Sequence, residues 1–280
     1  MAGPEFVAVG HVTLDVFGDV TRLGGAALYA AVTAHRLGLS AGILTSHADD
    51  FPLELIPSRI EVVSLPADAT TRFEHVVRGE HRTMRVPSIA RALGPADVPA
   101  DWSDAPLVLL APVANEVDPR VASAFDNPTL AVAAQGWLRG LRADGTVGPT
   151  RWTPPDSLLP RLQALVMSIE DVAGQERVAL EWFQRVPLGV LTAGRAGALL
   201  FVNGERYEVP PRPATAVDTT GAGDVFAAAF LVHYQSGGDA WEAAAAAACA
   251  ASLSVEAEGT AKVPDRATLD AALRDYHRSR

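Results

Sequence analysis

Two glycines and a carboxylate stand directly before a long apolar run in AVDTTGAGDVFAAAFL, which spans residues 216–231. A turn of this kind leaves the backbone N–H groups of Gly221, Ala222 and Gly223 at the start of a helix as unpaired donors. The helix macrodipole adds partial positive charge there, so the turn can bind an anion. Asp224 adds a carboxylate that can accept a proton beside that anion. These groups together suit phosphoryl transfer to a hydroxyl.

The same turn also has a purely structural interpretation, because Asp and Thr are common helix caps and glycine is common in tight turns. It is not a dinucleotide-binding fingerprint, since Phe226 occupies the third glycine position of G-x-G-x-x-G. Lys262 is the only lysine in the chain. That excludes a P-loop ending in G-K-[ST] and argues against catalysis through a lysine Schiff base.

Short, nearly continuous apolar runs predict the strands that would position this turn. Such strands are buried on both faces, as in parallel sheets. Helical patterns lie between several of them, for example over residues 25–37 and 176–185, and three more helices are predicted over 225–235, 241–256 and 265–277. We therefore expect one α/β domain over residues 1–280, with a doubly wound, mainly parallel sheet flanked by helices. The predicted strands begin at Phe6, Ala41, Glu61, Pro106, Thr129, Ala164 and Pro187.

Two segments break the alternation of strands and helices. Residues 199–209 contain an Asn-Gly pair, which predicts a hairpin that most simply extends an edge of the sheet. Residues 71–86 read as two alternating strands around Arg78-Gly79-Glu80, either a flap over a site or a solvated ribbon. We expect a small β lid formed by residues from about 11–22 and 70–88.

Composition narrows the classes of function. The 280 residues carry a net charge of −10, which argues against a nucleic-acid partner. Cys249 has no partner for an internal disulfide and is expected to be buried as a small hydrophobic residue. The sequence shows neither a signal peptide nor a stretch of about 18 apolar residues that could span a membrane, so we expect a cytoplasmic protein.

The string D-T-T-G-A-G-D followed by V-F-A-A-A-F resembles the C-terminal signature of the ribokinase-like, PfkB-type carbohydrate kinases. Three further motifs follow the family's order over nearly the whole chain. VGHVTLD with the LGGAALY glycine pair resembles the substrate side, LTAGRAGALLF the nucleotide-side strand and turn, and CAASLSVEAEG the terminal helix of the nucleotide wall. The resemblance implies a ribokinase-like fold and a phosphotransferase with an alcohol group as acceptor.

The resemblance also implies roles for individual residues. Asp224 is the base that deprotonates the substrate hydroxyl, and the amides of Gly221, Ala222 and Gly223 form the anion hole. The implied substrate side comprises Asp15, Gly24, Gly25, Gln135 and Arg139, and the implied nucleotide side comprises Thr192, Gly194, Gly197, Thr220 and Ser252. Three of these assignments have structural alternatives: Asp15 as a turn residue, the Gly24-Gly25 pair as a packing contact, and Arg139 as a solvated surface residue.

The family's N-x-x-E motif, which organises Mg²⁺ and phosphates, is altered in this chain. Ser168 stands at the asparagine position and Asp171 at the glutamate position, with Glu170 adjacent. Two carboxylates at a strand end can hold a hydrated Mg²⁺, whereas the alternative is an acidic helix N-terminus that begins at Ser168. The resemblance also implies a monovalent cation, such as K⁺, near Asp218.

The substrate is expected to be a small polyol or sugar. Tyr29 replaces an asparagine that follows the glycine pair in ribokinase-type members, which argues against ribose, and GGAALY, TRFEHVVRGEHRT and AVAAQGWLRG resemble a branch that includes inositol kinases. We therefore expect an ATP- and Mg²⁺-dependent kinase. The alternatives are a nucleoside kinase, in which Phe17, Tyr29 and Phe73 offer a stacking surface, and a non-catalytic ligand-binding relative. In this family flap strands often pair between subunits, which implies a homodimer through the lid.

Overall fold

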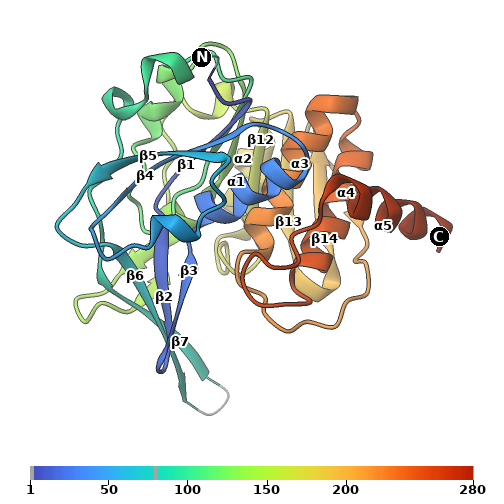
Figure 1. The fold of residues 1–280 in the computed structure, drawn as a ribbon. Helices are drawn as coiled ribbons and strands as arrows, with labels where there is room; N and C mark the ends of the chain where they lie inside the picture. Colours follow the sequence, from blue (N-terminus) through green and yellow to red (C-terminus); the bar gives the residue numbers. More distant parts are fainter. Residues whose placement is uncertain (1–2, 79–80, 280) are drawn as a thin grey trace.

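The computed structural model describes residues 3–78 and 81–279. Its centre is a nine-stranded sheet with the order β15-β14-β13-β12-β9-β8-β1-β4-β5 (Figure 1). The strands from β13 to β5 pair in parallel, and only the β13-β14-β15 edge is antiparallel. The predicted doubly wound, mainly parallel sheet is thus confirmed, and the 199–209 hairpin extends its edge. The strands are β1 (Phe6–Val9), β4 (Ala41–His47), β5 (Ile60–Pro66), β8 (Leu107–Leu110), β9 (Thr129–Ala133), β12 (Ala164–Ser168), β13 (Leu188–Thr192), β14 (Ala198–Val202) and β15 (Glu205–Val209).

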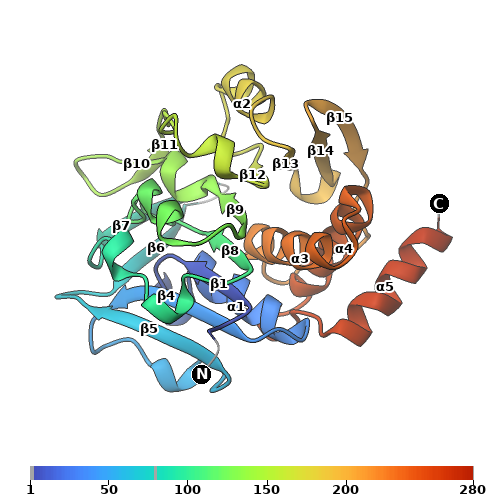
Figure 2. The same cartoon turned by 90° about the horizontal axis from the view of Figure 1, so that it is seen from above.

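Helices cover both faces of the large sheet because its central strands are apolar on both faces. In β1, Phe6 and Ala8 pack into one core with α1, α3, α4 and α5, whereas Val7 and Val9 pack into a second core that includes α2. Figure 2 shows α3 and α4 on one side of strands β12 and β13, with α2 on the other side. The helices are α1 (Ala26–Arg36), α2 (Glu176–Phe183), α3 (Ala222–Gly237), α4 (Ala240–Ser254) and α5 (Arg266–Arg278).

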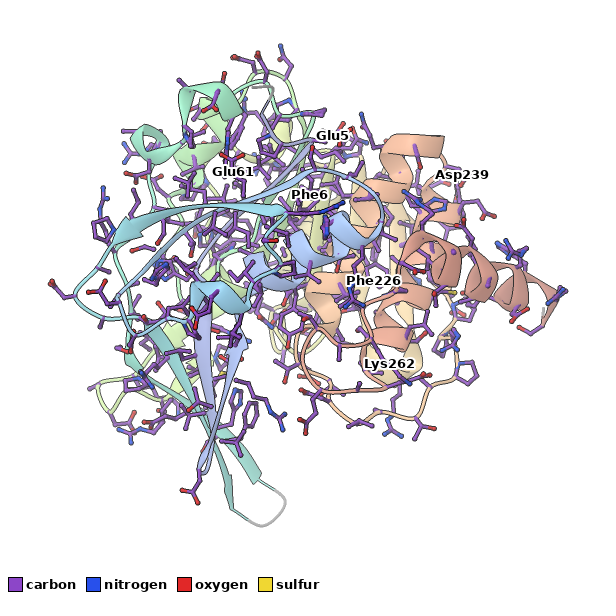
Figure 3. The ribbon with its side chains drawn as sticks, viewed as in Figure 1. Glu5, Phe6, Glu61, Phe226, Asp239 and Lys262 are labelled. Atoms are coloured by element: carbon purple, nitrogen blue, oxygen red, sulfur yellow. The ribbon has the colours of Figure 1, made fainter. Side chains whose placement is uncertain are left out.

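The three C-terminal helices follow the prediction except at the start of α3. The helix begins at Ala222, three residues earlier than predicted, after Gly221 adopts a left-handed conformation with φ 75°. Phe226 then lies on the buried side of α3 (Figure 3). The side chain of Asp239 accepts hydrogen bonds from the backbone N–H groups of Trp241 and Glu242 and so caps α4. The earlier start places Asp224 in the first turn of α3.

Cys249 is buried within α4, as expected. Among the helices that the structure describes, none combines the length and the apolar character that a membrane crossing requires.

A second, four-stranded sheet projects from the body of the molecule (Figure 1), with the order β3-β2-β6-β7. Its strands fall in the segments expected to form the lid, about 11–22 and 70–88, except that β3 continues to Gly24. The predicted turn at Gly79-Glu80 lies outside the described residues. The pairing of β2 with β6 is parallel and brings residues 13–16 beside residues 71–74. The strands are β2 (Thr13–Phe17), β3 (Val20–Gly24), β6 (Thr71–Arg78) and β7 (His81–Ser88).

Two short strands, β10 (Arg139–Leu141) and β11 (Val147–Pro149), were not predicted. Each has only three residues, which is too short for an alternating pattern to be distinguished from a loop.

Candidate active site

A cavity of about 450 Å³ lies between the small sheet and the N-terminus of α3. It brings together residues that are far apart in the sequence and that come from β2, α1, the segment after β9, the segment after β12 and the glycine turn. The predicted site residues among its lining are Asp15, Gly25, Gln135, Arg139, Glu170, Thr220, Gly221, Ala222, Gly223 and Asp224.

Several predicted residues lie outside that lining. Thr192 ends β13, Gly194 begins the turn that follows it, and the hydroxyl of Ser252 accepts a hydrogen bond from Nη1 of Arg212 at 3.2 Å. Gly197 has φ 91°, and a Cβ there would lie 2.2 Å from the carbonyl oxygen of Val209, so the closure of the sheet edge already requires this glycine. The roles of these residues in nucleotide binding therefore stay predictions.

The glycine turn packs against an aromatic ring. Gly221 has φ 75°, and a Cβ at this position would lie 2.4 Å from the ring of Tyr29, which is 2% exposed. The next amide, that of Ala222, donates to the carbonyl of Thr219 at 3.3 Å, so one of the three predicted anion-hole donors has a partner within the turn. At position 221, only glycine allows both the left-handed backbone conformation and the close approach to the Tyr29 ring.

Asp224 has an environment that suits a base operating near neutral pH. Burial raises the pKa of Asp224 to about 7, an effect opposed by the positive charge of Arg139 and reinforced by the negative charges of Asp171 and Asp15. A carboxylate near half-ionisation at neutral pH can both accept and release a proton efficiently. Strongly shifted carboxyl groups in cavities are typical of functional sites.

Arg139 is the cation that faces these carboxylates. Burial lowers the pKa of Arg139, while the charges of Asp171, Asp224 and Asp15 raise it. Its guanidinium lies 5.6 Å from the centre of the Phe73 ring and donates from Nη1 to the carbonyl of Val113 at 3.3 Å. Arg139 thus lines the cavity and differs from the solvated surface residue of the alternative interpretation.

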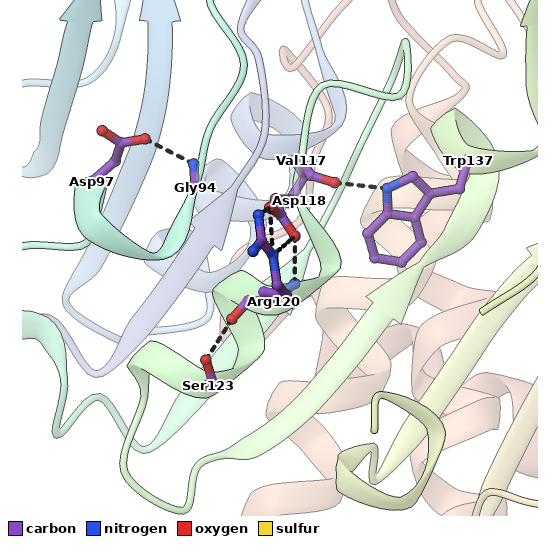
Figure 4. A network of polar contacts seen from close by, with 7 residues as sticks. All are labelled: Gly94, Asp97, Val117, Asp118, Arg120, Ser123 and Trp137. Carbon is purple, nitrogen blue, oxygen red and sulfur yellow. Dashed lines mark hydrogen bonds and ion pairs between the residues drawn. The ribbon is translucent and has the colours of Figure 1, made fainter. Parts of the chain in front are cut away.

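The segment that carries Gln135 and Arg139 is anchored from behind. Both residues flank Trp137, whose Nε1 donates to the carbonyl of Val117 at 2.9 Å (Figure 4). Asp118, the residue after Val117, accepts a hydrogen bond from the backbone N–H of Arg120 and so caps a short helix. Its carboxylate also pairs with the guanidinium of Arg120. The Trp137 side chain is 3% exposed and packs in the second core. The segment after β9 is therefore held against that core.

In the part of the cavity lining that comes from β2, Asp15 lies against the glycine pair. Asp15 is 6% exposed, and its Oδ1 accepts a hydrogen bond from Oγ1 of Thr13 at 2.7 Å. A Cβ at Gly24 would lie 2.3 Å from Oδ2 of Asp15, and Gly25 has φ 99°. The glycine pair is therefore a packing contact that also allows the start of α1 to approach the Asp15 carboxylate.

Glu116 is a buried acidic residue that sequence reasoning missed. It is 3% exposed, and its carboxylate accepts hydrogen bonds from the backbone N–H groups of His11, Val113 and Ala114 at 2.7 to 3.1 Å. Glu116 thus connects the loop before β2 to the loop that contains Val113, whose carbonyl accepts the hydrogen bond from Arg139. A single glutamate in APVANEVD has no pattern that marks it as buried.

Replacing Glu116 by Gln is expected to destabilise the fold, because charge-assisted hydrogen bonds from three backbone amides become weaker and one amide loses its acceptor. Hydrogen bonds to charged groups contribute about 1.5–3 kcal/mol, and we expect a decrease of that size in the free energy of unfolding, measured by urea denaturation. The exposed Glu181→Gln, which loses only an i,i+4 pair with Arg177, is the control, with an expected change below about 0.5 kcal/mol. Equal effects of the two variants would contradict the structural role of Glu116.

The two acids of the altered N-x-x-E segment differ in their surroundings. The N–H of Ser168 donates to Oδ2 of Asp171 at 3.0 Å, and the N–H of Asp171 donates to Oγ of Ser168 at 3.1 Å. This reciprocal pair has the hydrogen-bond pattern of a capping box, but no helix begins at Ser168, because residues 169–174 form turns and α2 starts at Glu176. Glu170, in contrast, lines the cavity. Within residues 3–78 and 81–279, no three His, Cys, Asp or Glu side chains gather into a metal-binding group.

Asp218 holds the glycine turn to neighbouring elements. Its Oδ1 accepts from the N–H of Thr220 at 2.9 Å, and its Oδ2 faces the N–H of Gly259 at 3.3 Å and Nη1 of Arg22 at 3.4 Å. Burial raises the pKa of Asp218, but the hydrogen bonds from Thr220 and Gly259 and the charge of Arg22 outweigh it and hold the pKa below its usual value. Asp218 is thus a paired carboxylate at neutral pH.

Comparisons with known proteins identify kinases with related sequences. The family model described as "pfkB family carbohydrate kinase" matches residues 164–266. A cytidine kinase of Thermococcus kodakarensis is 26% identical over 258 residues, which cover 83% of this chain and 89% of that protein. An inositol 3-kinase of Zea mays is 34% identical over 179 residues, which cover 62% of this chain and 46% of the relative. The chain spans about half the length of the plant inositol 3-kinases that it matches.

Solved structures share the fold. A pyrophosphate-dependent kinase in the ribokinase family superposes with a TM-score of 0.80 at 21% identity, covering 95% of this chain and 99% of that chain. The ribokinase of Thermotoga maritima superposes with a TM-score of 0.74, also at 21% identity, covering 96% and 99%. The fold, the family match over residues 164–266 and the kinase relatives lead to one assignment: the chain resembles the PfkB, ribokinase-like kinases and is a phosphotransferase with an alcohol group as acceptor.

Proposed function

We propose that this protein transfers the terminal phosphoryl group of ATP to a hydroxyl of a small polyol or sugar, with an inositol-like compound as the preferred class. One observation carries the proposal. A single cavity contains a carboxylate with a raised pKa in the first turn of a helix, together with Asp15, Gln135 and Arg139 in its lining. These are a base, an anion site and partners for several hydroxyls.

Each group has a defined task in this reaction. Asp224 accepts the proton of the attacking hydroxyl, and the backbone N–H groups at the start of α3 stabilise the charge on the transferred phosphoryl oxygens. Asp15 accepts hydrogen bonds from neighbouring substrate hydroxyls and so aligns the attacking one. Arg139 donates to the substrate or the phosphoryl group and offsets the charge of the surrounding carboxylates.

The polar lining of the cavity favours a polyol substrate over a nucleoside. Thr13, Asp15, Gln135 and Arg139 offer donors and acceptors on several sides of the cavity, and the inositol 3-kinase relatives point to the same class. A nucleoside is the second candidate, because Phe73 and Tyr29 also line the cavity and a cytidine kinase matches most of the chain. Phe17 does not line the cavity but stacks on His75, with ring centres 4.3 Å apart.

Mg²⁺ would shield the phosphate oxygens of the donor. Glu170, which lines the cavity, and the second carboxylate oxygen of Asp171 fit a hydrated Mg²⁺, which is usually bound through one or two carboxylates, waters and substrate phosphates. We propose ATP as the donor. Pyrophosphate is the alternative to include in an assay, because solved structures of pyrophosphate-dependent kinases share this fold.

We also propose that the small sheet acts as a lid. Asp15 of β2, Phe73 of β6 and Met84 of β7 all line the cavity, so this sheet forms one of its walls. Closure of that wall would exclude water, which competes with the substrate as a phosphoryl acceptor. The edge strands of the lid are β3 and β7, and a homodimer through one of them stays a prediction.

The proposal is tested by measuring ADP or phosphate release with ATP or pyrophosphate and Mg²⁺ across inositols, pentoses, hexoses and nucleosides. We expect turnover on an inositol or a related polyol. Turnover on a nucleoside alone would overturn the substrate class and keep the kinase. The absence of turnover on every compound, with ATP still bound in calorimetry, would favour a non-catalytic ligand-binding protein.

The pH dependence of the rate gives a further check. Because burial raises the pKa of Asp224 to about 7 and the base acts when deprotonated, kcat/KM should rise about tenfold per pH unit below that value and level off above it. The profile is measured from pH 5 to 9 with stability monitored in parallel. A rate that is flat between pH 5 and 9 would show that ionisation of Asp224 does not control the reaction.

A further inference from the structure

Arg22 is a lid residue that reaches the catalytic loop. It lies on β3 directly opposite Asp15 of β2, so both side chains are on the same face of the small sheet. Its Nη1 lies 3.4 Å from Oδ2 of Asp218, and its Nη2 donates to Oε1 of Glu258 at 2.6 Å. The guanidinium also lies 5.1 Å from the centre of the Phe17 ring, within the range of a cation–π contact. One side chain thus connects the lid to two loops of the body.

The two body loops belong to one unit. The backbone N–H groups of Val217 and Asp218 both donate to the carbonyl of Val255 at the end of α4, at 2.7 and 3.1 Å. Oδ2 of Asp218 in turn faces the N–H of Gly259. The glycine turn that begins α3 is therefore supported through Asp218, and Arg22 is the positive charge at this support.

The Asp218 carboxylate does not fit a monovalent cation in this chain. Its Oδ1 accepts from Thr220, and its Oδ2 faces both Gly259 and Arg22. Asp218 is 11% exposed and Arg22 29% exposed, so the pair is partly shielded from water. A K⁺ ion beside the same carboxylate would lie within a few ångströms of the guanidinium, and repulsion between like charges at such distances is strong at low dielectric. The Arg22 guanidinium therefore lies where a K⁺ ion was expected beside Asp218.

We propose that Arg22 is a positioning residue that takes the place of a monovalent cation at the anion-binding turn, so that the kinase does not depend on K⁺. The guanidinium bridges Asp218 and Glu258 and holds the loop that presents the amides of α3 to the phosphoryl group. Because Arg22 is on β3, this support forms only when the lid is in place. The inference rests on the proposed kinase function and specifies how its anion site is held.

The test compares Arg22→Ala with the unaltered protein in K⁺ and in choline buffers of equal ionic strength. We expect the unaltered enzyme to have the same kcat in both. Arg22→Ala should lose about 100-fold in kcat in choline, since a misplaced catalytic turn costs about that much, with a smaller change in KM. Added K⁺ or guanidinium chloride at millimolar concentration should restore part of the rate. Arg22→Lys should keep an intermediate rate because it keeps the charge without the second hydrogen bond.

The matched control is Arg72→Ala. Arg72 is also a lid arginine, and it pairs with Asp50 at 2.6 Å, away from Asp218. Its loss should leave kcat and the response to K⁺ unchanged. A several-fold stimulation of the unaltered enzyme by K⁺, or an Arg22→Ala variant with full activity in choline, would overturn the inference while leaving the kinase function intact.

Thermal unfolding separates failure of the inference from failure of the proposed function. K⁺ should leave the melting temperature of the unaltered protein unchanged and raise that of Arg22→Ala by at least about 2 °C. This readout needs no substrate, so it decides the inference even if no compound is phosphorylated. A K⁺-dependent increase in the unaltered protein, equal to that in the variant, would contradict it.

Discussion

Asp224→Asn is expected to lower kcat by about 10²- to 10⁴-fold, the contribution typical of a positioned general base. The amide has nearly the shape of the carboxylate but does not accept a proton. Substrate contacts to Asp15, Gln135 and Arg139 are unchanged, so KM should change by much less than kcat. A loss confined to kcat indicates an interaction made in the transition state.

The same substitution is expected to stabilise the fold above neutral pH. Asp224 has a folded-state pKa of about 7 against an ordinary value of 3.8. Between these two values the unfolded state releases its proton first, so the stability of the unaltered protein falls as pH rises. The asparagine variant does not incur this loss. It should unfold at higher denaturant concentration than the unaltered protein at pH 8, and the difference should shrink towards pH 4.

Rate and stability are measured on the same preparations, because only their combination is diagnostic. A variant that loses activity by unfolding would be less stable, whereas the loss of a base whose pKa is raised by desolvation gives a slower but more stable enzyme. Asp239→Asn is the control. Asp239 caps α4 far from the cavity, asparagine is an equally good cap, and activity should be retained. Full activity of Asp224→Asn with the best substrate would falsify the assignment of the base.

The fold was predictable from the sequence because the chain is locally consistent. The central strands begin within one residue of their predicted starts, since apolar runs of four to eight residues bounded by Gly, Pro or Asp have few other uses in a chain of this size. The glycine turn was also predictable, because the full string D-T-T-G-A-G-D before an apolar run resembles a family signature, whereas the glycines and the acid alone also had a structural interpretation. Ten of the predicted site residues line one cavity.

The missed features depend on contacts between distant segments. Glu116 lies in a loop without periodicity, and its three amide partners are 2, 3 and 105 residues away. Arg22 meets Asp218 and Glu258 from 196 and 236 residues away. The raised pKa of Asp224 likewise comes from burial and from the negative charges of Asp171 and Asp15, against the opposing charge of Arg139. Residue type and spacing carry no information on such contacts between distant segments.

Gly221→Ala is expected to have the second largest effect. The residue has φ 75°, a conformation that costs a residue with a Cβ about 1–3 kcal/mol. The new Cβ would also lie 2.4 Å from the ring of Tyr29, which is 2% exposed. Relief of this clash moves the turn that supplies the anion-binding amides. We expect kcat to fall about 10²- to 10³-fold, comparable to the loss of an oxyanion-hole donor.

Two further variants separate backbone strain from the clash. Gly223→Ala places a Cβ in open space within the helix, so its unfolding free energy should be unchanged or higher by up to about 1 kcal/mol. Tyr29→Ala removes the ring that Gly221→Ala would meet. If the clash contributes, the double variant loses less stability than the sum of the two single losses, by more than about 0.5 kcal/mol. Strictly additive losses would mean that the left-handed backbone alone requires glycine at position 221, and that Tyr29 supports the turn without restricting it.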